Sequence, residues 1–72
     1  MGEDVHTVPD GDSWKVKVGG MSTGRRYSTQ GEAAEAGRKE AQKQQSEHYI
    51  HRPDGSIRDA DSYGDDPYPP EG

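Results

Sequence analysis

The sequence contains no cysteine, no phenylalanine and no leucine, and Val and Ile together number six. Without cysteine the chain has no disulfide, no thiolate zinc site and no thiol nucleophile. No apolar run approaches the roughly 20 residues of a membrane span. The opening Met-Gly-Glu-Asp lacks the basic and apolar segments of a secretory signal. We therefore expect a cytoplasmic protein that does not cross a membrane.

The small apolar content also limits the core. Seventy-two residues suffice for one domain, and hydrophobic residues make up only 25% of them. A composition this poor in aliphatic residues is typical of disordered chains. The regular alternation and turn spacing described below argue for a fold, whose stability we expect to be marginal.

The net charge of −5 is unevenly distributed along the chain. Residues 1–14 carry −4, residues 15–43 carry +4, residues 44–52 are neutral and residues 53–72 carry −5. A basic centre therefore lies between two acidic ends, and this layout is the main electrostatic feature available for function.

The N-terminal part predicts a β-hairpin. Residues 5–8 favour a strand, and Pro9-Asp10-Gly11 has the composition of a tight turn. Residues 13–18 then alternate strictly between two kinds of side chain, which is the pattern of a half-buried strand. One face of that strand would carry Trp14, Val16 and Val18, and the other Ser13, Lys15 and Lys17.

A helix is predicted in the middle of the chain. Gly19-Gly20 ends the second strand, a loop is expected over residues 21–24, and residues 25–28 favour a short third strand. Thr29 and Glu32 have the spacing of a capping box, which predicts a helix over residues 30–45. Its inner stripe is made of small residues that allow a close approach to a sheet, namely Ala33, Ala34, Gly37 and Ala41.

Residues 47–58 repeat the hairpin signal around Pro53-Asp54-Gly55. We expect an α+β domain of β-β-α-β-β order over residues 5–63, in which two hairpins form an antiparallel sheet with one helix on a face. Residues 1–4 read as a frayed terminus. Residues 64–72 read as a flexible acidic, proline-rich tail.

Four segments carry a family resemblance. They are residues 6–9 with 14–16, residues 29–36, residues 50–57, and Asp61-Ser62-Tyr63-Gly64-Asp65-Asp66-Pro67 followed by Pro69-Pro70. Together they resemble a small bacterial family known as domain of unknown function 2188. The resemblance implies a compact β-β-α-β-β domain and brings no activity or catalytic residue with it. The helix departs from the family pattern by having small or polar residues where bulkier aliphatics are usual, at Ala34, Gly37, Ala41 and Gln44.

No motif predicts an enzyme, a cofactor or a metal ion. The serines occupy turns, caps and strand ends without a nucleophile-elbow pattern, and the glycines match no phosphate-binding loop. His48 and His51 are three apart, so on a strand they face opposite sides and cannot chelate together. His6 and His51 could meet if their strands pair, with Asp10 or Asp54 nearby, but polar strand surface explains them without a metal.

Two kinds of binding function follow from the charge layout and the thin core. The basic centre predicts weak nucleic-acid binding through Lys15, Lys17, Arg25 and Arg26, because neutralised phosphates release counterions. Ordinary pairing of the helical bases with Glu32, Glu35 and Glu40, together with the overall acidity, argues against it. The rival is a protein partner or a homodimer bound through the sheet, since one helix leaves part of the sheet uncovered. The protein-binding function is the preferred prediction.

Overall fold

The computed structural model describes residues 3–63 of the 72-residue chain. They form five strands in one sheet and one helix, so the predicted small α+β domain is confirmed. In chain order the elements are β1 (Val5–Asp10), β2 (Ser13–Val18), β3 (Met21–Tyr27), α1 (Gln30–Gln44), β4 (Glu47–His51) and β5 (Ile57–Ser62). The predicted tail, residues 64–72, and the first two residues of the predicted frayed terminus lie outside the described residues.

The first hairpin forms as predicted, with its turn displaced by one to two residues. Asp10 pairs with Ser13, so the two-residue loop is Gly11-Asp12, and Pro9 and Asp10 belong to β1. Gly11 has φ +65°, the value that the first position of a type II′ hairpin turn requires. Such turns match the twist of the flanking strands, which is why the turn falls on the glycine.

The third strand is longer than the sequence indicated. Met21 pairs with Val18 directly across a Gly19-Gly20 loop, so the segment predicted as a loop over residues 21–24 belongs to β3. Gly-Gly between two apolar residues is a hairpin signal in its own right. The β2–β3 register shifts between Lys15 and Lys17, an irregularity of the kind produced by a β-bulge.

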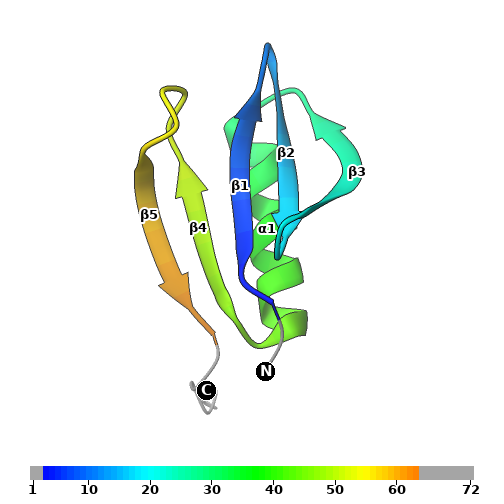
Figure 1. Ribbon diagram of the computed structural model, residues 1–72, viewed down its shortest axis with the longest axis vertical. Helices are drawn as coiled ribbons and strands as arrows, with labels where there is room; N and C mark the ends of the chain where they lie inside the picture. Colours follow the sequence, from blue (N-terminus) through cyan, green and yellow to red (C-terminus); the bar gives the residue numbers. More distant parts are fainter. Residues whose placement is uncertain (1–2, 64–72) are drawn as a thin grey trace.

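The two hairpins join through a parallel pair. The strand order is β3-β2-β1-β4-β5, and β1 pairs with β4 in parallel while the other neighbours are antiparallel (Figure 1). The expectation of a wholly antiparallel sheet was therefore wrong for this central pair. The reason is the helix between the two hairpins. Because α1 crosses over the sheet, β4 runs in the same direction as β3, and β3 runs in the same direction as β1.

The second hairpin and the helix start agree with the sequence. Pro53-Asp54-Gly55 forms a turn in which the Gly55 amide donates to the Arg52 carbonyl at 2.8 Å. Thr29 has an extended backbone and its hydroxyl accepts from the Glu32 amide at 3.1 Å, which caps α1 as predicted.

The core lies between α1 and the three strands β1, β2 and β4. Its fully buried hydrophobic members among the described residues are Val5, Val16, Ala33 and Ala41. Half-buried hydrophobics complete it, namely Trp14, Val18, Tyr27, Ala36 and Tyr63. The predicted alternation of β2 is confirmed, since Trp14, Val16 and Val18 all face this core. Ala33, Gly37 and Ala41 form the buried stripe of the helix, and Ala34 is half-buried beside it.

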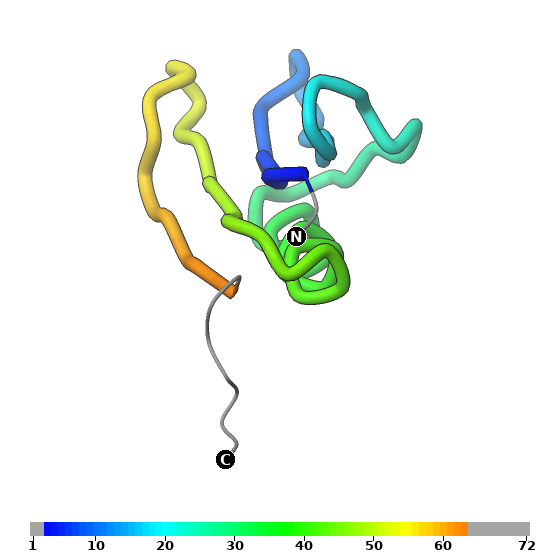
Figure 2. Tube along the Cα trace, turned by 60° about the horizontal axis from the view of Figure 1, so that its bottom comes forward, coloured from blue at the N-terminus to red at the C-terminus, as the bar shows by residue number. Residues whose placement is uncertain are grey.

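The helix covers only one face of the sheet (Figure 2). Within the described structure it packs against β1, β2, β4 and part of β3, and it meets β5 through side chains such as Arg58, which donates to Gln30 at 2.6 Å. No helix in residues 3–63 has the length and apolar character needed to cross a membrane. The sheet therefore has a helix-covered face and an opposite face on which no described element packs.

Candidate binding surface

The uncovered side of the sheet carries a defined set of side chains, which we call the open face. Thr7, Val16 and His48 point toward the helix, so their strand neighbours point to the other side. Cross-strand pairs extend the assignment, because His6 lies opposite both Lys17 and Tyr49, and Lys15 lies opposite both Val8 and Arg26. The open face consists of the side chains that share this side of the five strands: His6, Val8, Asp10, Ser13, Lys15, Lys17, Ser22, Arg26, Glu47, Tyr49, His51, Ala60 and Ser62.

Two histidines meet at the centre of the open face. Nδ1 of His6 lies 3.0 Å from Nε2 of His51, and Nδ1 of His51 lies 3.0 Å from the Gly55 carbonyl oxygen. A carbonyl only accepts, so His51 must carry its proton on Nδ1 and leave Nε2 as an acceptor. His6 then donates from Nδ1. The sequence-based possibility that His6 and His51 meet is confirmed, while their second contact is Gly55 rather than an aspartate.

Tyr49 holds the His6 ring from the neighbouring strand. The two rings are stacked with centroids 4.9 Å apart and planes 25° apart. The Tyr49 hydroxyl donates to Glu47 at 3.1 Å, and this hydrogen bond to the carboxylate raises the pKa of the Tyr49 hydroxyl. Burial, followed by the effect of His51, lowers the pKa of His6, which keeps its imidazole neutral near pH 7. The result is an ordered, neutral aromatic cluster.

The four basic residues predicted to bind nucleic acid do not share one surface. Lys15, Lys17 and Arg26 lie on the open face, in neighbouring positions of β2 and β3. Arg25 points the other way and lines a cavity beside α1 together with Lys39 and Tyr27. Arg26 also forms an ion pair with Asp10 at 3.1 Å. The open face therefore has three of the four bases, one of them paired.

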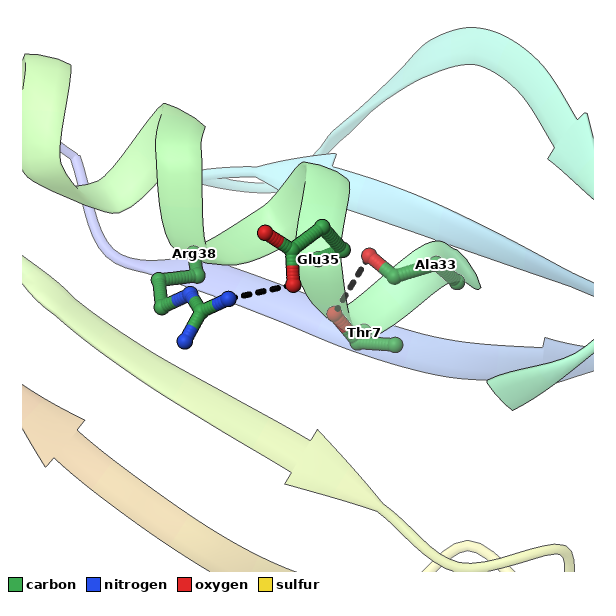
Figure 3. A network of polar contacts seen from close by, with 4 residues as sticks. All are labelled: Thr7, Ala33, Glu35 and Arg38. Atoms are coloured by element: carbon green, nitrogen blue, oxygen red, sulfur yellow. Dashed lines mark hydrogen bonds and ion pairs between the residues drawn. The ribbon is translucent and has the colours of Figure 1, made fainter. Parts of the chain in front are cut away.

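Two of the three helical bases, Arg38 and Lys43, are paired as the counter-argument predicted, and neither pair involves Glu32. Arg38 forms an ion pair with Glu35 and Lys43 lies 3.7 Å from Glu40, both with i,i+3 spacing (Figure 3 shows the first). The Arg38 guanidinium lowers the pKa of the Glu35 carboxyl through this hydrogen bond. These pairs are exposed or partly exposed, so each contributes little to stability.

A buried polar pair lies on the other side of the sheet, beneath the helix. The Thr7 hydroxyl is 2.7 Å from Nε2 of His48 and donates to the Ala33 carbonyl at 3.5 Å, the contact drawn in Figure 3. Since that hydroxyl has one proton, satisfying both contacts requires Nε2 of His48 to donate. Burial lowers the pKa of His48, and its Nδ1 has no partner among the described residues.

The pair fits beneath the helix because residue 37 is a glycine and has no side chain at the point of contact. A Cβ built on Gly37 would lie 2.5 Å from both the Thr7 hydroxyl oxygen and Nε2 of His48. Sequence reasoning missed the pair, because His48 was interpreted as strand surface and Gly37 only as a small residue. The signal that could have found it is the alternation of β4, in which His48 and Ile50 share the side opposite Tyr49.

A shallow cavity lies beside His48. Its volume is about 150 Å³, and its lining comes from α1, β4 and β5: Gly31, Ala34, Glu35, Arg38, His48, Ile50 and Asp61. Within residues 3–63 no group of three or more His, Asp or Glu side chains is placed to hold a metal ion. The cavity combines opposite charges with a small apolar floor.

Comparison with models of protein families shows the family of the chain. The family model described as uncharacterized protein conserved in bacteria (DUF2188) matches residues 5–63. The chain therefore belongs to this bacterial family, as its sequence segments indicated. No curated protein and no solved structure gives a significant match.

Proposed function

We propose that the domain is a non-enzymatic binding module that uses the open face to bind a protein, including a second copy of itself. The observation that carries this proposal is the placement of the helix on one face only of the described sheet (Figure 2). The other face carries an ordered set of aromatic, imidazole and basic side chains. Aromatic side chains that are already held in place bind with little further loss of conformational entropy.

The composition of the open face favours a protein partner. Val8 and Tyr49 supply apolar and aromatic surface, while the bases and the acids Asp10 and Glu47 of the same face supply both signs of charge. Protein interfaces combine an apolar, aromatic centre with a polar rim in this way. The thin core adds a second reason, because a partner that binds only the folded state stabilises it by mass action.

The sheet edges are less suited to pairing than the face. Arg58, Asp59 and Asp61 charge the exposed strand β5, and the opposite edge strand β3 has an irregular register and carries Arg25 and Arg26. Charges and bulges of this kind discourage edge-to-edge pairing. Contact through the face is therefore preferred over extension of the sheet.

Val8→Glu tests the open face. We expect sedimentation of the parent protein to show concentration-dependent association, and Val8→Glu to abolish it by placing a charge in the contact. Gln42→Glu is the matched control, because it adds the same charge on an exposed position of α1 and should leave association unchanged. A strict monomer over a wide concentration range, combined with a pull-down from a bacterial host that captures no partner, would refute the proposal.

Nucleic-acid binding is the second candidate. It is favoured by one observation, the adjacent positions of Lys15, Lys17 and Arg26 on the open face. Tyr49 lies on the same face, two strands from Lys17 with His6 between them, and its ring offers a stacking surface. The net charge of −5 and the Asp10–Arg26 pair oppose it.

Titration with duplex and single-stranded oligonucleotides at low salt measures this activity. If it exists, Lys15→Ala combined with Lys17→Ala should weaken binding and lower its salt dependence, because two phosphate contacts are lost. Arg25→Ala is the control, since it removes one base from the other side of the sheet. Affinity no tighter than millimolar in the parent protein would exclude this candidate.

A further inference from the structure

The His6–His51 pair has the spacing of two ligands on one metal ion. Metal–imidazole bonds are about 2.0–2.1 Å long, so two nitrogens on one ion lie about 2.9 Å apart at a right angle and about 3.4 Å apart at a tetrahedral angle. The observed distance between His6 Nδ1 and His51 Nε2 is 3.0 Å. This value is closest to cis coordination at a right angle.

The protonation of His51 already suits a ligand. Its Nδ1 donates to the Gly55 carbonyl, which fixes the ring and leaves the Nε2 lone pair facing His6, from which it accepts a hydrogen bond in the absence of an ion. Such a backbone contact on the far nitrogen is the usual outer partner of a metal-bound imidazole. His6 needs one change, the transfer of its proton from Nδ1 to Nε2 through solvent, after which both facing nitrogens offer lone pairs. No net proton is released.

The surroundings hold the His6 ring in place, and burial lowers its pKa. Tyr49 stacks on His6, and His6 belongs to β1 at the centre of the sheet. The charged groups that act on His6 are Asp4, which favours a nearby cation, and Lys17, which opposes one. Because residues 3–63 offer no third ligand here, water or a bound molecule would complete the coordination.

We propose that His6 and His51 form a two-histidine site for a divalent first-row transition-metal ion on the open face. The right-angle geometry favours Cu²⁺ and Ni²⁺ over Zn²⁺, and the general order of affinities places Cu²⁺ above both. Both ligands come from one chain. A failure to bind metal would therefore leave the proposed protein-binding function untouched, and a failure to bind a protein would leave the metal site untouched.

Calorimetric titration of the tag-free protein with Ni²⁺ and with Cu²⁺ tests the site. We expect one ion per chain, and about tenfold or greater weakening in His6→Ala and in His51→Ala, since outer partners alone already change affinity by this order. Lys17→Ala is the matched control on the same face. It should bind at least as tightly as the parent, because it removes a positive charge beside His6. Circular dichroism melts establish that each variant is folded.

Nitrogen-15 NMR of the imidazoles with Zn²⁺ identifies the ligating atoms. The expected result is a shift at His6 Nδ1 and His51 Nε2, with the buried His48 unchanged as an internal reference. Three results would overturn the site: no binding up to millimolar ion, unchanged affinity in a folded His6→Ala or His51→Ala variant, or a shift located at His48.

Discussion

Gly37→Ala is expected to destabilise the domain by about 2 kcal/mol or more, although alanine is the better helix former. The added Cβ would meet the Thr7 hydroxyl and the His48 ring at 2.5 Å, so the helix must move away from the sheet or the pair must separate. Overpacking costs about 1–3 kcal/mol, and an unpaired buried polar group costs about 1–3 kcal/mol more. The gain in helix propensity, about 1 kcal/mol, offsets only part of this loss.

Gly31→Ala is the matched control in the same helix. Its Cβ would meet only the Thr29 hydroxyl, at 4.0 Å, which is ordinary contact. Here the propensity term acts alone, and we expect a gain of up to about 1 kcal/mol. Chemical denaturation of both variants measures the two effects. If Gly37→Ala were as stable as Gly31→Ala, the close approach of helix and sheet at Gly37 would be wrong.

Trp14→Ala is expected to cost about 3 kcal/mol, the lower end of the range for removing a large aromatic side chain from a core. The lower end applies because Trp14 is half-buried rather than fully buried. Domains of this size rarely have more than about 3–5 kcal/mol of stability, so the variant should be largely unfolded at room temperature.

Met21→Ala is the control for Trp14→Ala. Met21 lies on β3 opposite Val18 and is 75% exposed, so its removal should leave the melting temperature nearly unchanged. Thermal melts followed by circular dichroism compare the two variants. A melting temperature for Trp14→Ala close to that of the parent would show that the indole does not support the core.

The sequence predicted the strand β2, the helix start and the second turn correctly, because each of these is determined by residues close together in the chain. Alternation on β2, the Thr29 cap and the Pro53-Asp54-Gly55 turn each depend on neighbours within a few residues. The parallel β1–β4 pair could not be predicted in the same way. It depends on where the helix returns the chain, and no short-range pattern records that.

The candidate binding surface was predicted only in part, for the same physical reason. Lys15 and Lys17 follow from alternation. Alternation along the predicted strand over residues 25–28 also places Arg25 and Arg26 on opposite sides, which the prediction of one shared basic surface overlooked. The contact between His6 and His51 required β1 and β4 to be neighbours, which left it a possibility. The buried Thr7–His48 pair was missed because neither residue type indicates burial by itself.

The most direct test of the account is amide NMR of the parent protein over a wide concentration range. The proposal that the domain binds through the uncovered side of its sheet predicts shifts confined to the strands, strongest around His6, Lys17 and Tyr49 at its centre. Shifts located instead on the outer surface of α1, around Lys39 and Gln42, would contradict it.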